Sequence, residues 1–313
     1  MICNDILAII VFHVPKHNAK KMLSVSKKIK RLTISYKNVV LCVTSDVLEK
    51  CRLDEHRHVK ISKDFSDIVE KIPLSITRVT FDNDFYGKII IPKHIKYVKC
   101  GFLFSCRSEI FASDLLELSH IDLGYKHNKI HKLSRNIKHL TLGMFHNENI
   151  DKLKLLNKLE YLKCGQRFNK DVDNLPNSLV TLILGRDFNQ KINNLPKNLK
   201  TLILGDEFNQ EVCNLPDNIE TLKFGFCFNK PINMLPNNII KLELGYCFNQ
   251  DINNLPDSIT NLTLNFSFSK YVDKIPKNLK YLRLPNASYL EFFSEIDLSN
   301  VNVIFYQKKQ IKN

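Results

Sequence analysis

The chain of 313 residues has no tryptophan, only nine glycines and no apolar run of eighteen or more residues. The last absence argues against a helix that crosses a bilayer. The apolar stretch over residues 6–12 lacks a basic segment before it and a small-residue cleavage site after it, so we expect no secretory signal. These absences predict an intracellular, cytoplasmic protein with no membrane partner.

Sequence motifs for catalysis and metal binding are missing as well. There is no G-x-S-x-G nucleophile motif, no G-x-x-x-x-G-K phosphate loop followed by Ser or Thr, and no C-x-x-C pair. The ten histidines are not paired with cysteines at ligand spacing, which argues against a zinc site. We therefore predict a binding protein that is not an enzyme and that needs neither a metal nor a cofactor.

The chain does contain a repeat of fixed length. The pair Phe-Asn recurs every twenty residues, at 168–169, 188–189, 208–209, 228–229 and 248–249, and Phe268-Ser269 continues the series. A period of this length indicates a solenoid, in which each repeat packs on its neighbours. Looser copies extend the array to about eleven turns, from near Arg57 to Leu284. The amide of each repeated asparagine is expected to satisfy a tight turn within its own coil.

Each repeat supplies one short strand. Leu202 and Leu204 alternate with Thr201 and Ile203, which is the period-two pattern of a strand with one buried face. Twenty residues leave no room for a full helix beside the strand, so the return limb must be extended or a tight helical turn that ends at Leu-Pro. The sequence thus predicts a leucine-rich-repeat-like stack with a parallel sheet, in which Leu202 and Leu222 face one shared interior.

Aligning the repeats separates cysteines at buried positions from cysteines that lie on adjacent coils. Cys100 and Cys164 occupy positions that hold leucine in other turns, and they are expected to be small buried side chains in a reducing compartment. Cys227 and Cys247 fall at the same position of adjacent coils, where we expect them to be able to pair on oxidation.

The formal charge of +14 is concentrated at the front of the chain. Residues 1–60 carry twelve basic and five acidic side chains, whereas residues 166–285 carry fourteen and twelve. The lysines of residues 20–31 alternate with apolar residues at helical spacing, which favours an amphipathic helix with a solvated basic face. The near-neutral repeats offer no continuous basic groove, so nucleic acid is the least favoured partner.

The outward positions of the strands differ from coil to coil, and we predict that they form the substrate-binding concave face. Most repeats have a glycine where the strand ends, such as Gly225 and Gly245, and the residues just past this position, Phe226, Tyr246 and Phe266, are expected to stack on neighbouring turns. They form either a binding hot spot or a cover for the loop edge of the sheet. A polysaccharide hydrolase with coils of this length would need converging carboxylates, but Glu243 is the only one at these strand positions. The predicted substrate-binding residues are Ile183, Ile203, Lys223, Glu243, Arg186, Asp206, Phe226, Tyr246 and Phe266.

Short modules are expected at both ends of the array. In residues 1–50, two apolar stripes at helical spacing are separated by Pro15 and predict two short helices. The tail over residues 286–313 is apolar enough to close the last coil, so the solenoid itself is assigned to residues 57–285 and is most regular over 159–285. A terminal cap would keep the end of the core dry and protect the sheet edge.

The repeat resembles a known family. The unit F-N-x-x-I-x-x-L-P-x-x-L-x-x-L-x-L-G, present at 188–205, is similar to the FNIP repeat, a relative of the leucine-rich repeat that is abundant in social amoebae and in giant viruses of amoebae. The resemblance implies a protein-interaction solenoid, located in the host cytoplasm if the chain is viral.

The N-terminal segment resembles an F-box in two stretches. Residues 4–14 begin with the acidic-Ile-Leu pattern, and residues 22–28 are similar to the later Leu-x-x-Val-Ser/Cys-Lys pattern. This resemblance implies a substrate receptor of a cullin-type ubiquitin ligase, in which the front helices dock on a Skp-family adaptor and the repeats choose the target protein. The alternative is a stand-alone repeat scaffold whose front helices only cap the solenoid. The implied adaptor-binding residues are Ile6, Leu7, Ile10, Val14, Leu23 and Val25.

Overall fold

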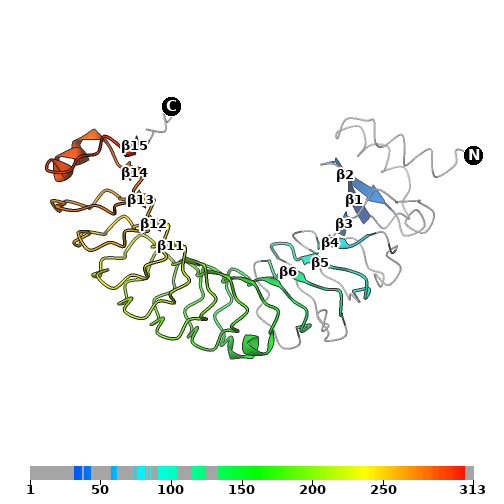
Figure 1. The fold of residues 1–313 in the computed structure, drawn as a ribbon. Helices are drawn as coiled ribbons and strands as arrows, with labels where there is room; N and C mark the ends of the chain where they lie inside the picture. The colour runs from blue at the N-terminus through cyan, green and yellow to red at the C-terminus, as the bar shows by residue number, and fades with distance from the viewer. Residues whose placement is uncertain are drawn as a thin grey trace, which may run out of the picture. The chain divides into compact units, whose positions relative to one another are not determined.

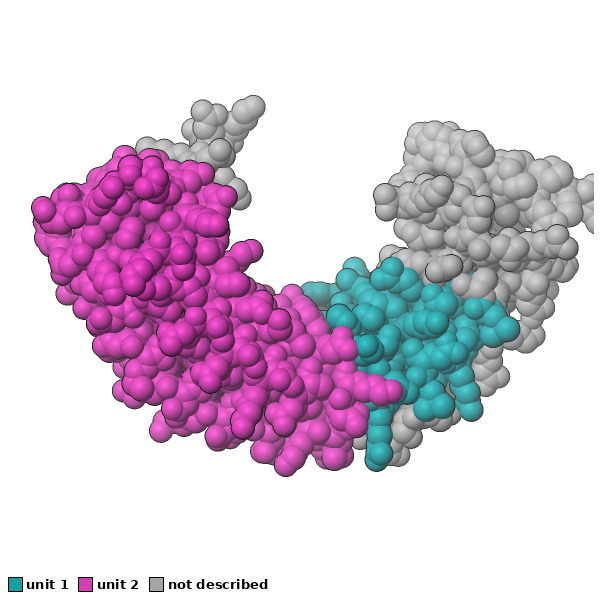
Figure 2. Space-filling view, in the orientation of Figure 1, with its two compact units in different colours: residues 1–143 teal, residues 144–313 magenta. Residues whose placement is uncertain are grey.

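The computed structural model divides into two compact units, residues 1–143 and 144–313 (Figure 2). The structure describes residues 32–36, 39–43, 58–61, 74, 76–81, 83, 85, 91–103, 115–124 and 133–306. No helix within these residues is long and apolar enough to cross a membrane.

In the first unit, a short antiparallel hairpin leads into a parallel sheet. Strands β1 (Leu32–Tyr36) and β2 (Val39–Val43) pair antiparallel, and β1 also pairs antiparallel with β3 (His58–Ile61). From β3 onward the pairing is parallel, and each strand contacts the next along the chain. The parallel strands that follow are β4 (Arg78–Phe81), β5 (Tyr97–Lys99), β6 (His120–Asp122) and β7 (His139–Thr141).

The second unit is a parallel stack whose strands lie one above another on its concave side (Figure 1). Strands β8 to β14 pair residues that are twenty positions apart, so that Leu202 lies opposite Leu182 and Leu222. Within residues 144–306, two 3₁₀ helices interrupt the strand series, η2 (Asp151–Leu155) and η3 (Ala287–Phe293). The strands are β8 (Tyr161–Lys163), β9 (Thr181–Ile183), β10 (Thr201–Ile203), β11 (Thr221–Lys223), β12 (Lys241–Glu243), β13 (Asn261–Thr263), β14 (Tyr281–Leu284) and β15 (Asn302–Phe305).

The predicted solenoid is confirmed as a parallel, leucine-rich-repeat-like β-solenoid of about ten turns. The return limbs of the regular coils are tight turns, such as the one closed by the Leu199 amide, which donates to the Pro196 carbonyl at 3.1 Å. The helical stripes predicted in residues 6–29 lie outside the described residues. Within the segment assigned to the helical module, residues 32–36 and 39–43 form the antiparallel strands β1 and β2, and the module as a whole stays a prediction.

The interior of the second unit is built from identical positions of successive coils. Leu202 and Leu222 are both fully buried and pair in register, as the alternation predicted. Burying one leucine side chain contributes about 1.5–3 kcal/mol, and the period places such a residue at the same point of every coil. Cys100 and Cys164 are buried at leucine positions, as expected, and burial raises the pKa of the Cys164 thiol.

A ladder of phenylalanine rings runs through this interior. The rings of Phe188, Phe208 and Phe228 are fully buried, and neighbouring ring centroids lie 6.1 and 6.0 Å apart with interplanar angles of 10° and 16°. The ladder begins at His146, which occupies the phenylalanine position of an earlier coil and stacks on Phe168 at 6.3 Å. The pattern Phe-Asn did not reveal this first rung, because the pair there is His146-Asn147.

The asparagine that follows each phenylalanine joins one coil to the next. The Asn209 side-chain oxygen Oδ1 accepts a hydrogen bond from the backbone amide of Asn229 at 3.0 Å, and the Asn209 amide donates to Asn189 Oδ1 at 3.0 Å. The same bond recurs along the series and ends at Ser269. The expectation of a partner within the same turn is therefore wrong, because the side chain reaches the neighbouring coil.

We expect Asn209→Ala to lower the free energy of unfolding by about 1–2 kcal/mol, because the part-buried Asn229 amide loses its acceptor. Asn209→Asp keeps an acceptor oxygen at this place and should retain most of the stability. Urea unfolding followed by circular dichroism, with hydrogen exchange at the Asn229 amide, measures both effects. Equal losses for the two variants would show that the inter-coil bond is not the cause.

Candidate functional site

The outward residues of strands β8 to β14, called the strand face below, form the candidate surface. Because side chains alternate along a strand, the residues on either side of each buried leucine point away from the interior. Ile183 and Ile203 lie opposite each other in the register and are half-buried. The Lys223 ammonium and the Glu243 carboxylate form an ion pair at 2.7 Å. The structure thus places the predicted strand residues side by side on one surface.

Four aromatic rings border the strand face where the strands end, and we call Phe226, Tyr246, Phe266 and Tyr306 the aromatic strip. The centroids of Phe226 and Tyr246 lie 4.6 Å apart with an interplanar angle of 4°. Tyr246 stacks on Phe266 at 5.4 Å, and Phe266 stacks on Tyr306 at 5.9 Å. The predicted stacking of the first three rings is confirmed. These three side chains are 48%, 42% and 49% exposed, so the stack is open to solvent along its length.

Tyr306 was not among the predicted site residues. It follows β15, which adds one more parallel strand beside β14 after the twenty-residue period has ended. The Tyr306 hydroxyl donates to Asn265 Oδ1 at 2.8 Å, which holds the ring against the strip. The Arg283 guanidinium lies 4.5 Å from the centroid of the same ring. Burial raises the pKa of the Tyr306 hydroxyl.

Charged side chains lie at both ends of the aromatic strip. Asp206 and Glu207 stand in the coil that precedes Phe226, and both are exposed. The Cys227 amide donates to the Asp206 carbonyl at 2.7 Å, which fixes the two coils in register. Arg186 holds the corresponding exposed position one coil earlier. At the other end, Arg283 is the charged group beside the last ring.

Cys227 lies between the strip and this acidic pair. Its thiol is 3.8 Å from Glu207 Oε2. Partial burial and the nearby Glu207 carboxylate both raise the pKa of the Cys227 thiol. Cys227 and Cys247 are both free thiols in the structure, and their pairing on oxidation remains a prediction.

We expect Glu207→Gln to accelerate alkylation of Cys227 by iodoacetamide at pH 8 by roughly twofold to threefold. A raised pKa reduces the fraction of reactive thiolate at this pH, and removing the carboxylate lowers the pKa again. Peptide mass spectrometry of timed samples measures the rate, and the exposed Cys213 serves as the internal standard. An unchanged Cys227 rate in the variant would contradict the proposed influence of Glu207.

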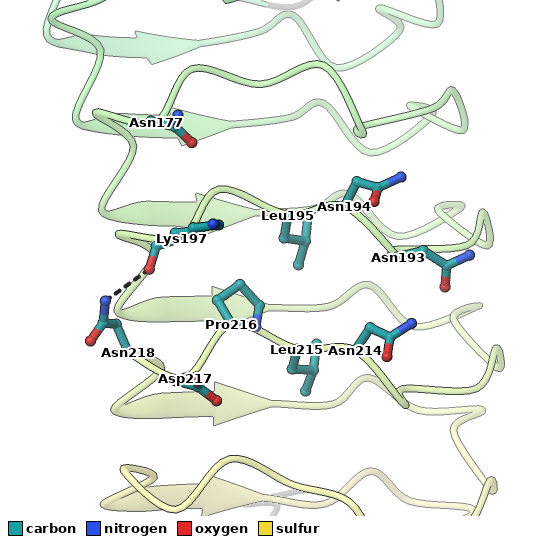
Figure 3. A pocket seen from close by; sticks show the side chains of 10 residues that line it. All are labelled: Asn177, Asn193, Asn194, Leu195, Lys197, Asn214, Leu215, Pro216, Asp217 and Asn218. Atoms are coloured by element: carbon teal, nitrogen blue, oxygen red, sulfur yellow. Dashed lines mark hydrogen bonds between the residues drawn. The ribbon is translucent and has the colours of Figure 1, made fainter.

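A groove between neighbouring return limbs is lined mainly by asparagines, together with Leu195, Leu215 and Pro216 (Figure 3). The Asn218 side-chain amide donates to the Lys197 carbonyl at 2.9 Å, and Asn198 and Asn238 make the same bond in adjacent coils. These asparagines join the coils, so we assign the groove a structural role.

The regular coils are similar to a known repeat family. The model of the FNIP Repeat family matches residues 188–227, 211–247 and 228–267, which lie within the most regular coils and support an FNIP repeat protein. A search of the curated proteins found no match. The crystal structure of CroV588, a novel circular LRR protein structure, is 26% identical to this chain, with a TM-score of 0.57 over 82% of this chain and 47% of that one. The chain thus spans about half the length of CroV588.

Two further structures share less sequence. The internalin InlF from Listeria monocytogenes is 12% identical, with a TM-score of 0.44 over 86% of this chain and 90% of that chain. The LRR protein LIC12759 from Leptospira interrogans is 15% identical, with a TM-score of 0.46 over 78% of this chain and 77% of that chain.

Proposed function

We propose that the chain is a non-enzymatic protein-interaction scaffold and that the strand face and aromatic strip of its second unit bind a partner protein. The observation that carries this proposal is the row of half-exposed rings at the rim of a sheet whose interior is already complete. Large aromatic side chains are the commonest anchors of protein interfaces, since they bury much apolar area with few rotatable bonds. FNIP and leucine-rich repeats are typical of such scaffolds, which supports the same reading.

The coil geometry suits a preformed binding surface. Backbone hydrogen bonds hold the strands in register, and the repeated asparagine after each buried phenylalanine adds one side-chain hydrogen bond per coil. A partner therefore meets rings that are already in place, which reduces the entropy lost on binding. Outward residues of the strands are also free to differ between coils, because the buried side chains and the inter-coil bonds of the repeated asparagines maintain the stack.

Selection from a random twelve-residue peptide library displayed on phage tests the proposal. We expect the enriched peptides to lose at least about tenfold in affinity for the double variant Phe226→Ala/Tyr246→Ala, as is usual for aromatic anchors. Met234→Ala is the matched control, because Met234 is a 68% exposed apolar residue on the return limb. Enriched peptides that bind all three proteins equally would refute the proposed surface.

The resemblance of residues 4–28 to an F-box supports a more specific second candidate, a substrate receptor of a cullin-type ubiquitin ligase. In this mechanism the front segment docks on the Skp-family adaptor, and the strand face holds the target near the recruited ubiquitin-conjugating enzyme. Proximity then replaces a bimolecular encounter with a local one. The chain would supply affinity and spacing without reacting itself.

Co-purification from a eukaryotic extract distinguishes the receptor from a stand-alone scaffold. The receptor should retain the Skp-family adaptor and the cullin, and the double variant Leu7→Asp/Val25→Asp should lose both. The variant must keep its circular dichroism spectrum for this loss to be interpreted. A folded wild-type chain that retains neither protein would leave the scaffold as the function.

A further inference from the structure

From the charges at the two ends of the aromatic strip, we infer that the partner presents an extended segment with a basic side chain at one end and an acidic side chain at the other. The basic side chain meets Asp206 and Glu207, the acidic one meets Arg283, and apolar side chains between them cover the ring edges. This inference rests on the proposed function, because it names the chemistry of the segment that the same surface takes.

The stacking of the rings determines which part of them a ligand can reach. Tyr246 lies between Phe226 and Phe266, at 4.6 and 5.4 Å, so both of its faces are covered and its exposed 42% is mainly ring edge. Phe266 is covered in the same way by Tyr246 and Tyr306. Nucleobases stack on open π-faces, which these inner rings do not offer. Ring edges carry partial positive charge and suit apolar side chains and carbonyl oxygens of a polypeptide.

The acidic end of the strip is open to a cation. Within the part of the chain that the structure describes, neither Asp206 nor Glu207 forms an ion pair. Both are exposed, and Asp206 holds the position that Phe226 occupies in the next coil. Phe226 stacks on Tyr246 through one face only, and its other face is turned toward the coil of Asp206. An arginine or lysine side chain can therefore meet two carboxylates and an aromatic face together.

The basic end is formed by Arg283. Its guanidinium rests over the Tyr306 ring, which fixes its position, and no carboxylate among the described residues pairs with it. The Lys223–Glu243 pair between the two ends is internally neutralised and contributes no net charge. The strip is thus negative at one end, apolar along its length and positive at the other.

The spacing of these ends sets the length of the segment. Asp206 follows β10 and Arg283 lies on β14, which is four strands further along the sheet, so the two charges are roughly 20 Å apart at about 4.8 Å per step. An extended chain rises about 3.3 Å per residue, so about six residues separate the two charges. The segment is therefore short, and a peptide can stand in for the whole partner.

Fluorescence anisotropy with three labelled peptides tests the inference. The bipolar peptide has an arginine near one end, an aspartate six positions away, and alternating leucine and threonine between them. In the acidic peptide the arginine is replaced by aspartate, and in the basic peptide the aspartate is replaced by lysine. We expect the bipolar peptide to bind about tenfold more tightly than either of the others at 50 mM salt.

Charge reversal on the protein tests the inferred polarity more directly than peptide binding to the wild type alone. The double variant Asp206→Lys/Glu207→Lys should lose the bipolar peptide and gain affinity for the acidic peptide, and Arg283→Glu should shift its preference to the basic peptide. Lys197→Glu, a reversal on the return limb, is the control and should change nothing. Such an exchange of preference is not produced by loss of folding.

The remaining outcomes separate this inference from the proposed function. If all three peptides bind equally and all are lost in Phe226→Ala/Tyr246→Ala, the surface binds peptides and the inferred polarity is wrong. No binding of the bipolar peptide at 1 mM also overturns the inference. Poly-uridine that binds the wild type and is lost in Arg283→Glu would identify a nucleic acid as the ligand and overturn it as well.

Discussion

Gly205→Val is expected to lower the free energy of unfolding of the second unit by about 3 kcal/mol or more, close to the upper range for overpacked sites. A Cβ atom on Gly205 would overlap the backbone carbonyl oxygen of Gly185 in the preceding coil. Gly185, Gly225 and Gly245 meet the coil before them in the same way. The obstruction is backbone, so no side-chain rotation relieves it, and the coils must separate. The repeated glycine is thus explained by close approach between coils.

Chemical unfolding of two companion variants tests this explanation. Asp206→Ala changes the adjacent exposed residue and should alter stability by no more than about 0.5 kcal/mol. Asn265 occupies the glycine position in a later coil, where its side-chain amide donates to the Leu244 carbonyl at 2.6 Å. We therefore expect Gly205→Asn, which can form the equivalent bond, to lose less stability than Gly205→Val. A valine variant as stable as the wild type would show that the coils can move apart freely.

The twenty-residue period made most of the second unit predictable. When a unit repeats without insertion, its geometry repeats as well, so the inward position of Leu202 fixes that of Leu222 and the outward position of Ile183 fixes that of Ile203. The same reasoning placed Phe226, Tyr246 and Phe266 on neighbouring coils and predicted their stacking. The period therefore predicts which residues lie on adjacent coils, but it does not predict which molecule binds them.

Contacts that do not follow the twenty-residue repeat could not be predicted from it. Tyr306 lies beyond the last regular repeat, so no register relates it to Phe266. The partner of each repeated asparagine depends on how the turns of adjacent coils are offset, which a single repeat does not specify. The β1–β2 hairpin did leave a signal, since two β-branched runs flank the two residues 37–38.

Phe208→Ala is expected to cost about 3–5 kcal/mol, the usual range for removing a fully buried aromatic side chain. The change removes the stacking of Phe208 on Phe188 and Phe228, whose centroids lie 6.1 and 6.0 Å away, and it leaves a cavity between three coils. Phe226→Ala is the matched control, because Phe226 is the same residue type eighteen positions later but is 48% exposed on the aromatic strip. Its cost should stay below about 1 kcal/mol, since solvent already reaches the ring.

The positions at which Phe208→Ala accelerates hydrogen exchange test the solenoid more directly than the total loss of stability does. Each coil contacts only its neighbours, so stability is a sum of coil and interface terms and need not be lost everywhere at once. Hydrogen exchange should therefore quicken most in β9 to β11 and at the bonded amides that directly follow these strands, such as Leu184 and Leu204, and least at β14, whose Leu282 lies four coils away. Uniform acceleration across the second unit would mean that its coils unfold as one cooperative block. The strand face could then not open separately from the interior, and both would belong to one cooperative structure.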